Sequence, residues 1–110
     1  MARQENKPEA GDDTRGSATT TDTVVHIVDD DPLMCKALAA MVDAGGWRYE
    51  IHGSAEPFLA ETRDHRPGCV LLDMRMPGMN GLDCLREMKK RDWTLPVVMV
   101  TAHADVELAV

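Results

Sequence analysis

Two short apolar runs that each end in aspartate limit the fold of this chain more than any other feature. The run Val24–Val28 is followed directly by three aspartates, residues 29–31, and the run 69–72 is followed by Asp73. Unbroken apolar runs separated by helix-like stretches are typical of buried parallel strands, and α/β proteins place ligands at the carboxyl ends of such strands. Carboxylates gathered there would repel one another unless a cation or a proton relieved the repulsion. The pattern therefore predicts a divalent metal ion beside a reactive aspartate.

From residue 23 onward, strand-like and helix-like segments alternate. Strands are expected over 24–28, 47–52, 69–72 and 96–100, with a helix after each of the first three and the start of another helix over 104–110. Short connections between alternating strands and helices favour right-handed crossovers and a parallel sheet covered on both faces. The expected fold class is therefore α/β. In the flavodoxin-like strand order, the first and third strands are neighbours.

Capping residues and apolar spacing indicate where the helices begin and which side they bury. Pro32 after an aspartate cap opens a helix to about residue 44, two glycines end it, and Ser54 caps the next helix. The apolar face of the first helix is expected at Met34, Ala37, Leu38, Met41 and Val42. The apolar positions of the helix after the loop 74–81 are Leu82, Leu85 and Met88. Core packing is also the expected role of several methionines, Met34, Met41, Met88 and Met99 among them.

Composition and length exclude several classes of protein. The 110 residues suffice for one domain, over 23–110, and the polar segment 1–22 is expected to be a disordered leader. A net charge of -7, from 19 acidic and 12 basic residues, argues against direct nucleic-acid binding by this chain. No apolar stretch is long enough for a membrane span and no signal peptide is visible, so the expected location is the cytoplasm. Three widely spaced cysteines predict reduced core residues.

The expected site lies where the first and third strands end. Asp29, Asp30 and Asp73 would converge there, and magnesium accepts one or two carboxylates while keeping positions for phosphate oxygens. A carboxylate can also attack phosphorus and form an acyl phosphate. Thr101, at the end of the fourth strand, could donate its hydroxyl to a phosphoryl oxygen. Phosphoryl transfer of this kind needs mainly positioning and charge neutralisation.

Three ordered motifs carry a resemblance to a known family. The segments V-D-D-D-P, L-L-D-M-R-M-P-G-M-N-G and V-M-V-T-A-H-A-D-V resemble the signatures of response regulator receiver domains, the last being similar to the FixJ-type subgroup. The resemblance covers residues 23–110. It implies a CheY-like, flavodoxin-like (βα)5 fold with sheet order 2-1-3-4-5. It also implies a phosphorelay role, in which a sensor histidine kinase transfers a phosphoryl group to one aspartate, without enzymatic turnover by this chain.

The resemblance assigns roles to individual residues. Asp73 matches the phosphoacceptor, and Asp30 matches the acid that binds Mg²⁺ (or Mn²⁺) directly. Asp29 would act on the metal through water, and the backbone carbonyl of Arg75 matches the third protein ligand. Thr101 matches the hydroxyl residue that moves toward the phosphoryl group and transmits the switch.

Further positions match the rim and the loop of the family site. Ala102 is a small residue where the family needs access to the acceptor. Arg75 and His103 occupy rim positions that tune the lifetime of the phosphoaspartate in this family. Pro77 and Gly81 match its loop. A homodimer and a DNA-binding output domain in a missing C-terminal part are further family inferences, with no residue of this chain to support them.

The chain departs from the family at its C-terminal end. Members continue with a fifth strand, which bears a lysine that contacts the phosphoryl group, and with a fifth helix, whereas this sequence stops at Val110. No residue here supplies that lysine by position. Loss of the fifth helix would expose apolar surface at about 25 cal/mol per Å². The expectation is a truncated piece of a longer regulator, or a chain that folds only with help.

Other interpretations remain open at this point. A hydrolase of the haloacid-dehalogenase type also uses an aspartate after a strand, but it needs a second acid where this chain has Arg75. A receiver-like module that is not phosphorylated and serves only protein contacts is the main alternative. Asp31 is expected to be a helix cap. His26 is expected to be a buried or half-buried histidine, and His52 and His65 to be surface residues. The basic run 89–91 is expected to be a solvated helix end.

Overall fold

The computed structural model describes residues 23–62 and 67–100, which form a four-stranded parallel sheet with helices on both faces. In chain order the elements are β1 (Val24–Val28), α2 (Pro32–Ala44), β2 (Arg48–His52), α3 (Ala55–Glu61), β3 (Gly68–Asp73), α4 (Gly81–Lys90) and β4 (Val97–Val100). The strand order is β2-β1-β3-β4, and all three pairings are parallel. This confirms the predicted flavodoxin-like arrangement, in which β1 and β3 are neighbours.

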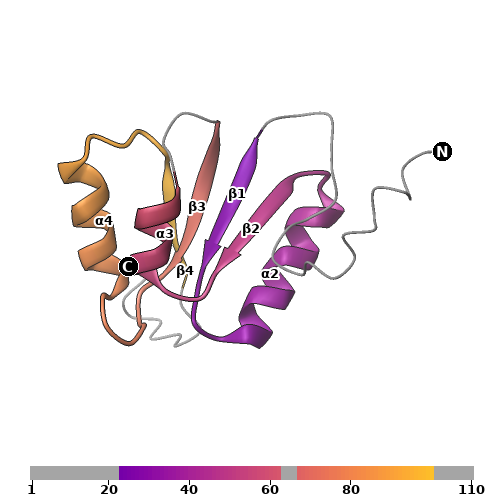
Figure 1. The fold of residues 1–110 in the computed structure, drawn as a ribbon. Helices are drawn as coiled ribbons and strands as arrows, with labels where there is room; N and C mark the ends of the chain where they lie inside the picture. Colours follow the sequence, from indigo (N-terminus) through magenta and orange to yellow (C-terminus); the bar gives the residue numbers. More distant parts are fainter. Residues whose placement is uncertain (1–22, 63–66, 101–110) are drawn as a thin grey trace, which may run out of the picture.

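Figure 1 shows how the helices divide between the two faces of the sheet. Helix α2 lies on one face, and α3 and α4 lie together on the other. On the α3 and α4 side, the core includes Val28, Phe58, Leu72 and Met88, all at most 2% exposed. On the α2 side, a smaller core includes Ile27, Cys35 and Ala39. Successive residues of β1 therefore serve opposite cores, as expected for a central strand.

The helix caps confirm part of the sequence prediction. Asp31 is the N-cap of α2, where its carboxylate accepts a hydrogen bond of 3.0 Å from the backbone N–H of Leu33, and Pro32 takes the first helical position. Asn80 caps α4 by accepting from the N–H of Asp83 at 2.9 Å. Ser54 stands at the N-cap position of α3 as predicted, but its side chain makes no capping hydrogen bond.

The predicted apolar face of α2 is only partly correct: Leu38 and Val42 pack against the core on this side, but Ala37 and Met41 do not. The buried side chains are Cys35 and Ala39, whereas Ala37 is exposed and Met41 is 70% exposed. The thiol of Cys35 donates a hydrogen bond of 3.2 Å to the carbonyl of Asp29, which fixes the rotation of the first helical turn against β1.

The other predicted core residues have mixed outcomes. Met88 is buried and Met99 packs against the larger core, as predicted, but Leu82 is 44% exposed and α4 instead buries Cys84. All three cysteines are free thiols. The observed strands begin and end within one residue of the predicted bounds. For example, β2 begins at Arg48 instead of Trp47.

Some predictions fall on residues outside the described part of the chain. These are the leader over 1–22, His65, the helix expected over 104–110, and the three site positions Thr101, Ala102 and His103. Among the described helices, none combines the length and the apolar character needed to cross a membrane.

Candidate functional site

Three carboxylates meet at the carboxyl ends of the two central strands. Asp29 follows β1 directly and Asp73 ends β3, and the last residues of β1 pair with β3 in register, with Val28 opposite Leu72. One carboxylate oxygen each from Asp29, Asp30 and Asp73 lies within 4.8 Å of the others. The structure therefore brings together the three aspartates that the sequence placed at neighbouring strand ends.

The three aspartates differ in their exposure to solvent. Asp29 and Asp73 are buried, at 5% and 7% exposed, whereas Asp30 is exposed. Parallel pairing explains the convergence, because strands that run in one direction deliver their carboxyl ends to one edge of the sheet. The result is an acidic cluster with a buried floor and one solvent-facing carboxylate, which is a donor set suited to a hard cation such as a divalent metal ion.

Backbone hydrogen bonds orient the two buried carboxylates. Asp29 Oδ1 accepts a hydrogen bond of 2.9 Å from the backbone N–H of Asp31. The residue that caps α2 therefore also positions the Asp29 carboxylate. Asp73 Oδ1 accepts from the backbone N–H of Arg75 at 3.3 Å. Each carboxylate is thus held by the loop that follows its own strand, and this leaves further oxygen lone pairs for other ligands.

The electrostatics of the cluster favour a bound cation. Burial raises the pKa of the Asp29 carboxyl above its usual value, and the negative charges of Asp73, Asp30 and Asp31 add to this effect. The hydrogen bond from the N–H of Asp31 acts in the opposite direction. A divalent cation at the cluster would remove the repulsion that helps to raise this pKa.

The loop between β3 and α4 forms the rest of the rim. Met74, Arg75, Met76, Pro77 and Asn80 line an open depression that begins one residue after the acceptor candidate Asp73. The amide of the first helical residue, Gly81, donates a hydrogen bond of 3.1 Å back to the carbonyl of Met74, which closes the loop onto the end of β3.

Glu56 of α3 also belongs to this region, although no sequence motif marks it. Its carboxylate accepts a hydrogen bond of 3.1 Å from the backbone N–H of Met79, so α3 supports the loop from the side. Glu56 and Met79 are 23 residues apart and belong to no common motif. Only the packing of α3 beside α4 brings them together.

One histidine was also predicted wrongly. His52 was expected at the surface, but it is half-buried, and its Nε2 lies 3.3 Å from Nδ1 of the buried His26. His26 itself is buried and partnered, as predicted. Residues 50 and 52 share one face of β2, and the register between β2 and β1 brings that face to His26.

Comparison with known proteins places the chain in a family. The model of the response regulator receiver domain matches residues 25–110. The transcriptional regulatory protein FixJ of Rhizobium meliloti (strain 1021) is 42% identical over 90 residues, which are 82% of this chain and 44% of that protein. The chain thus spans less than half the length of this relative.

Solved structures agree with this relationship. The crystal structure of FixJ-N superposes with a TM-score of 0.71 and 40% identity, over 82% of this chain and 72% of that one. The MaeR response regulator bound to beryllium trifluoride superposes with a TM-score of 0.61 and 28% identity, over 79% of this chain and 73% of that one. Together with the shared sheet order and the acidic cluster, these matches show that the chain belongs to the response regulator receiver domain family, as a receiver of the FixJ-type two-component regulators.

Proposed function

We propose that this receiver accepts a phosphoryl group from a sensor histidine kinase on Asp73. The observation that carries this assignment is the convergence of Asp73 with Asp29 and Asp30 at one edge of the sheet, within 4.8 Å. Asp73 ends a buried strand and has one oxygen tied to the N–H of Arg75. Its other oxygen is the proposed nucleophile.

The proposed reaction is a single transfer. An oxygen of Asp73 attacks phosphorus, the bond between phosphorus and the imidazole nitrogen of the kinase breaks, and that nitrogen keeps the electron pair. The product is an acyl phosphate on Asp73. The backbone N–H of Arg75 holds the carboxylate in position for the attack, and the buried floor of the cluster limits the access of water to the product.

Magnesium is the proposed cofactor, with manganese as a substitute. The proposed direct ligands are Asp30, Asp73 and the backbone carbonyl of Arg75, and Asp29 acts through water. The donor set fits, because Mg²⁺ prefers oxygen ligands and commonly uses one or two carboxylates together with water and phosphate oxygens. When bound, the ion neutralises charge on the phosphoryl oxygens and on the carboxylates.

Thr101, Ala102 and His103 complete the proposed site. The hydroxyl of Thr101 would donate to a phosphoryl oxygen, the small side chain of Ala102 would leave the acceptor accessible, and His103 would tune the lifetime of the acyl phosphate. The order of the three motifs in the sequence supports these roles. The output of the full regulator, proposed to be transcriptional, would lie in a part of the protein beyond this chain.

Acetyl phosphate with Mg²⁺ tests the proposal on the intact chain. The wild-type protein should gain the mass of one phosphoryl group, and Asp73→Asn should gain none. Asp31→Asn is the matched control, because Asp31 lies beside the same cluster, caps α2 and has no proposed role in the transfer. Its labelling should equal that of the wild type.

The same experiment separates the alternatives. Omission of Mg²⁺, with a chelator present, should abolish the labelling. Beryllium trifluoride is a second probe, because the similar MaeR receiver was solved with it bound. If the folded wild-type chain neither gains a phosphoryl group nor binds beryllium trifluoride, the interaction-module interpretation is favoured instead.

A further inference from the structure

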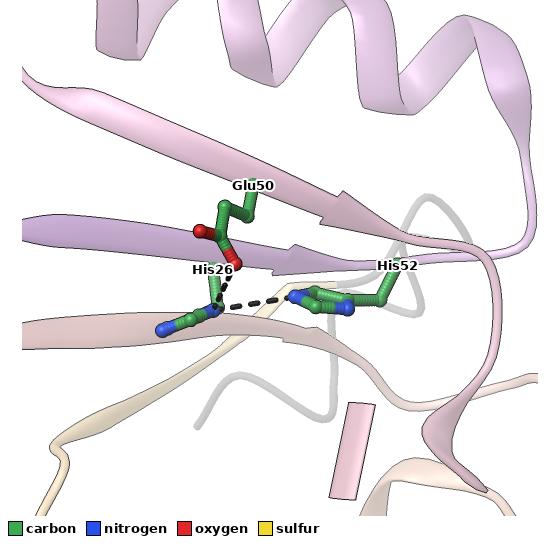
Figure 2. A group of neighbouring side chains, drawn as sticks. All are labelled: His26, Glu50 and His52. Carbon is green, nitrogen blue, oxygen red and sulfur yellow. Dashed lines mark hydrogen bonds and ion pairs between the residues drawn. The ribbon is translucent and has the colours of Figure 1, made fainter. Parts of the chain in front are cut away.

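A second cluster of metal-ligating side chains lies on the same sheet, beside the acidic cluster, because the backbone N–H of Asp29 donates a hydrogen bond of 3.0 Å to the carbonyl of His52. It consists of His26 from β1 and Glu50 and His52 from β2, which Figure 2 shows pointing toward one another. In the register of the two strands, His26 is paired with Glu50, and His52 lies two residues further along the same face. Both strands therefore contribute to one compact group on the side of the sheet that α3 covers.

The ligand atoms of this cluster are close enough to share one ion. His26 Nδ1 lies 3.3 Å from His52 Nε2 and 3.9 Å from Glu50 Oε1, and all three ligand atoms lie within 4.8 Å of one another. Two imidazole nitrogens bound tetrahedrally to zinc, at about 2.0–2.1 Å each, would be roughly 3.3–3.4 Å apart. The two nitrogens thus already have the required spacing. The side chain of Glu50 is 28% exposed, and a small rotation would bring its carboxylate to the same ion.

The surroundings hold both rings in place. Phe58 of α3 packs against His26 and His52, with ring centroids 5.6 Å and 5.1 Å apart, respectively. The side chain of His26 is only 10% exposed. An imidazole that is already oriented and largely desolvated loses little entropy when it binds a metal ion.

The protonation state also suits a metal ligand, because imidazole must be neutral to coordinate. Burial and the neighbouring His26 lower the pKa of His52 to about 4, against smaller opposing effects of Glu50 and Glu61. His52 is therefore neutral at pH 7. Without metal, the two rings share one hydrogen bond between Nδ1 and Nε2. With metal, the proton of that bond would reside on the outer nitrogen of the same ring instead.

We propose that His26 Nδ1, His52 Nε2 and the Glu50 carboxylate form a binding site for Zn²⁺ or a similar first-row transition metal. Two nitrogens and one carboxylate are a donor set that zinc accepts and magnesium does not favour, so the two clusters of this domain select different metals. The fourth position would hold water. Because the ligands come from two strands, the ion would tie the edge strand β2 to the central strand β1.

The test is a Zn²⁺ titration of the full chain, read by competition with a chromophoric chelator, in saturating Mg²⁺ so that the aspartates are occupied. One Zn²⁺ should bind per chain. Glu50→Gln and His52→Asn should each weaken binding about tenfold or more. Glu61→Gln is the matched control, because Glu61 acts on His52 only through its charge, and its affinity should stay within about twofold of the wild type.

Further readouts keep the result independent of folding defects and of the proposed phosphorylation. Zn²⁺ should raise the unfolding temperature of the wild type, and Co²⁺ should give the visible absorption of a tetrahedral, nitrogen-ligated ion that Glu50→Gln alters. Asp30→Asn and Asp73→Asn should retain the Zn²⁺ affinity. The proposal is overturned if Zn²⁺ fails to bind the folded wild type, if binding survives unchanged in both ligand variants, or if it is lost in Asp30→Asn.

Discussion

At the scale of single residues, the position of Asp73, the proposed phosphoacceptor, depends on a glycine. A side chain at Gly81 would overlap the backbone carbonyl oxygen of Asp73 and lie 2.9 Å from Cα of Met74. Only hydrogen fits between the first turn of α4 and the end of β3. This close approach brings the loop between β3 and α4 back to the end of β3, where the acidic cluster lies.

We expect Gly81→Ala to lower the free energy of unfolding by about 1–3 kcal/mol, because the backbone must move to admit the methyl group. Labelling by acetyl phosphate should fall as well, since the displaced carbonyl belongs to Asp73. Urea unfolding and intact mass measure the two effects. Gly53→Ala is the control, because a methyl group there meets nothing within 4 Å, and its stability should be unchanged or slightly higher. Equal stability of the two variants would contradict the prediction.

His52 gives the domain a specific sensitivity to acid. Its pKa falls from 6.5 in the unfolded chain to about 4 in the fold, mainly through burial and then through His26. Between these values the unfolded state binds more protons than the folded state, so stability is complete above pH 6.5 and is lost as the pH falls toward 4. The whole shift corresponds to roughly 3 kcal/mol, and partial exposure reduces this to about 1–2 kcal/mol.

Urea unfolding in a metal-free buffer at several pH values between 7 and 4 measures this effect. The wild type should lose more stability over this range than His52→Gln does, and the difference should be about 1–2 kcal/mol. The comparison uses the change in unfolding free energy with pH in each protein. A constant loss of stability in His52→Gln, from the missing hydrogen bond to His26, therefore does not affect it. Parallel pH curves for the two proteins would show that His52 does not titrate in this way.

The two clusters show what the sequence could and could not reveal about single residues. Asp29, Asp30 and Asp73 were predictable because each lies within two residues of a strand end, where position in the sequence determines position in the sheet. The His26 and His52 pair depends on the register between β1 and β2 and on cover from α3. The hydrophobic pattern of a single segment reveals neither this register nor this cover, so the sequence alone indicates a surface position for His52.

At the scale of elements, capping differs among the three helices that the structure describes. Asp31 and Asn80 accept hydrogen bonds from the first turns of α2 and α4, but Ser54 makes none at α3. Asp31→Ala should therefore destabilise the fold by about 1 kcal/mol, whereas Ser54→Ala should change it by only a few tenths. Thermal or urea unfolding of the two alanine variants checks the difference.

Asp31→Asn refines this prediction, because asparagine keeps the capping oxygen and removes the charge. The charge of Asp31 contributes to the raised pKa of Asp29, so its loss relieves some repulsion in the acidic cluster. We expect Asp31→Asn to be at least as stable as the wild type. A loss as large as that of Asp31→Ala would mean that the charge, rather than the hydrogen bond, stabilises the start of α2.

The packing of α2 explains why element boundaries were easier to predict than buried faces. Pro32 and the two glycines mark the ends of the helix in the sequence, and the structure confirms both ends. The buried face depends instead on a tertiary contact, the hydrogen bond from Cys35 to the carbonyl of Asp29. Burial and the nearby Asp29 charge raise the pKa of this thiol to about 11, so it keeps its proton and remains a donor.

At the scale of the whole molecule, the described helices cover the two faces of the sheet unequally. Helices α3 and α4 pack over the larger core, whereas α2 packs mainly on β1 and β2. Large apolar side chains on this second side stay exposed, with Leu33 at 76%, Met41 at 70% and Val98 at 52%. Val98 pairs with Leu71, a residue of the smaller core, which places it beside the edge of that core.

Exposed apolar surface of this kind favours association, because each contact between copies removes it from water at about 25 cal/mol per Å². We therefore expect the unfolding midpoint of the 110-residue chain to rise with protein concentration, as it does for any protein whose folded state associates. Urea unfolding over a hundredfold range of concentration measures this. Val98→Thr keeps the β-branched shape and removes apolar surface, so it should weaken the dependence of the midpoint on concentration. Asp43→Asn, on the exposed side of α2, is the control and should leave this dependence unchanged. A midpoint that does not change with concentration in the wild type would show that the described fold is stable as a single copy despite this open face.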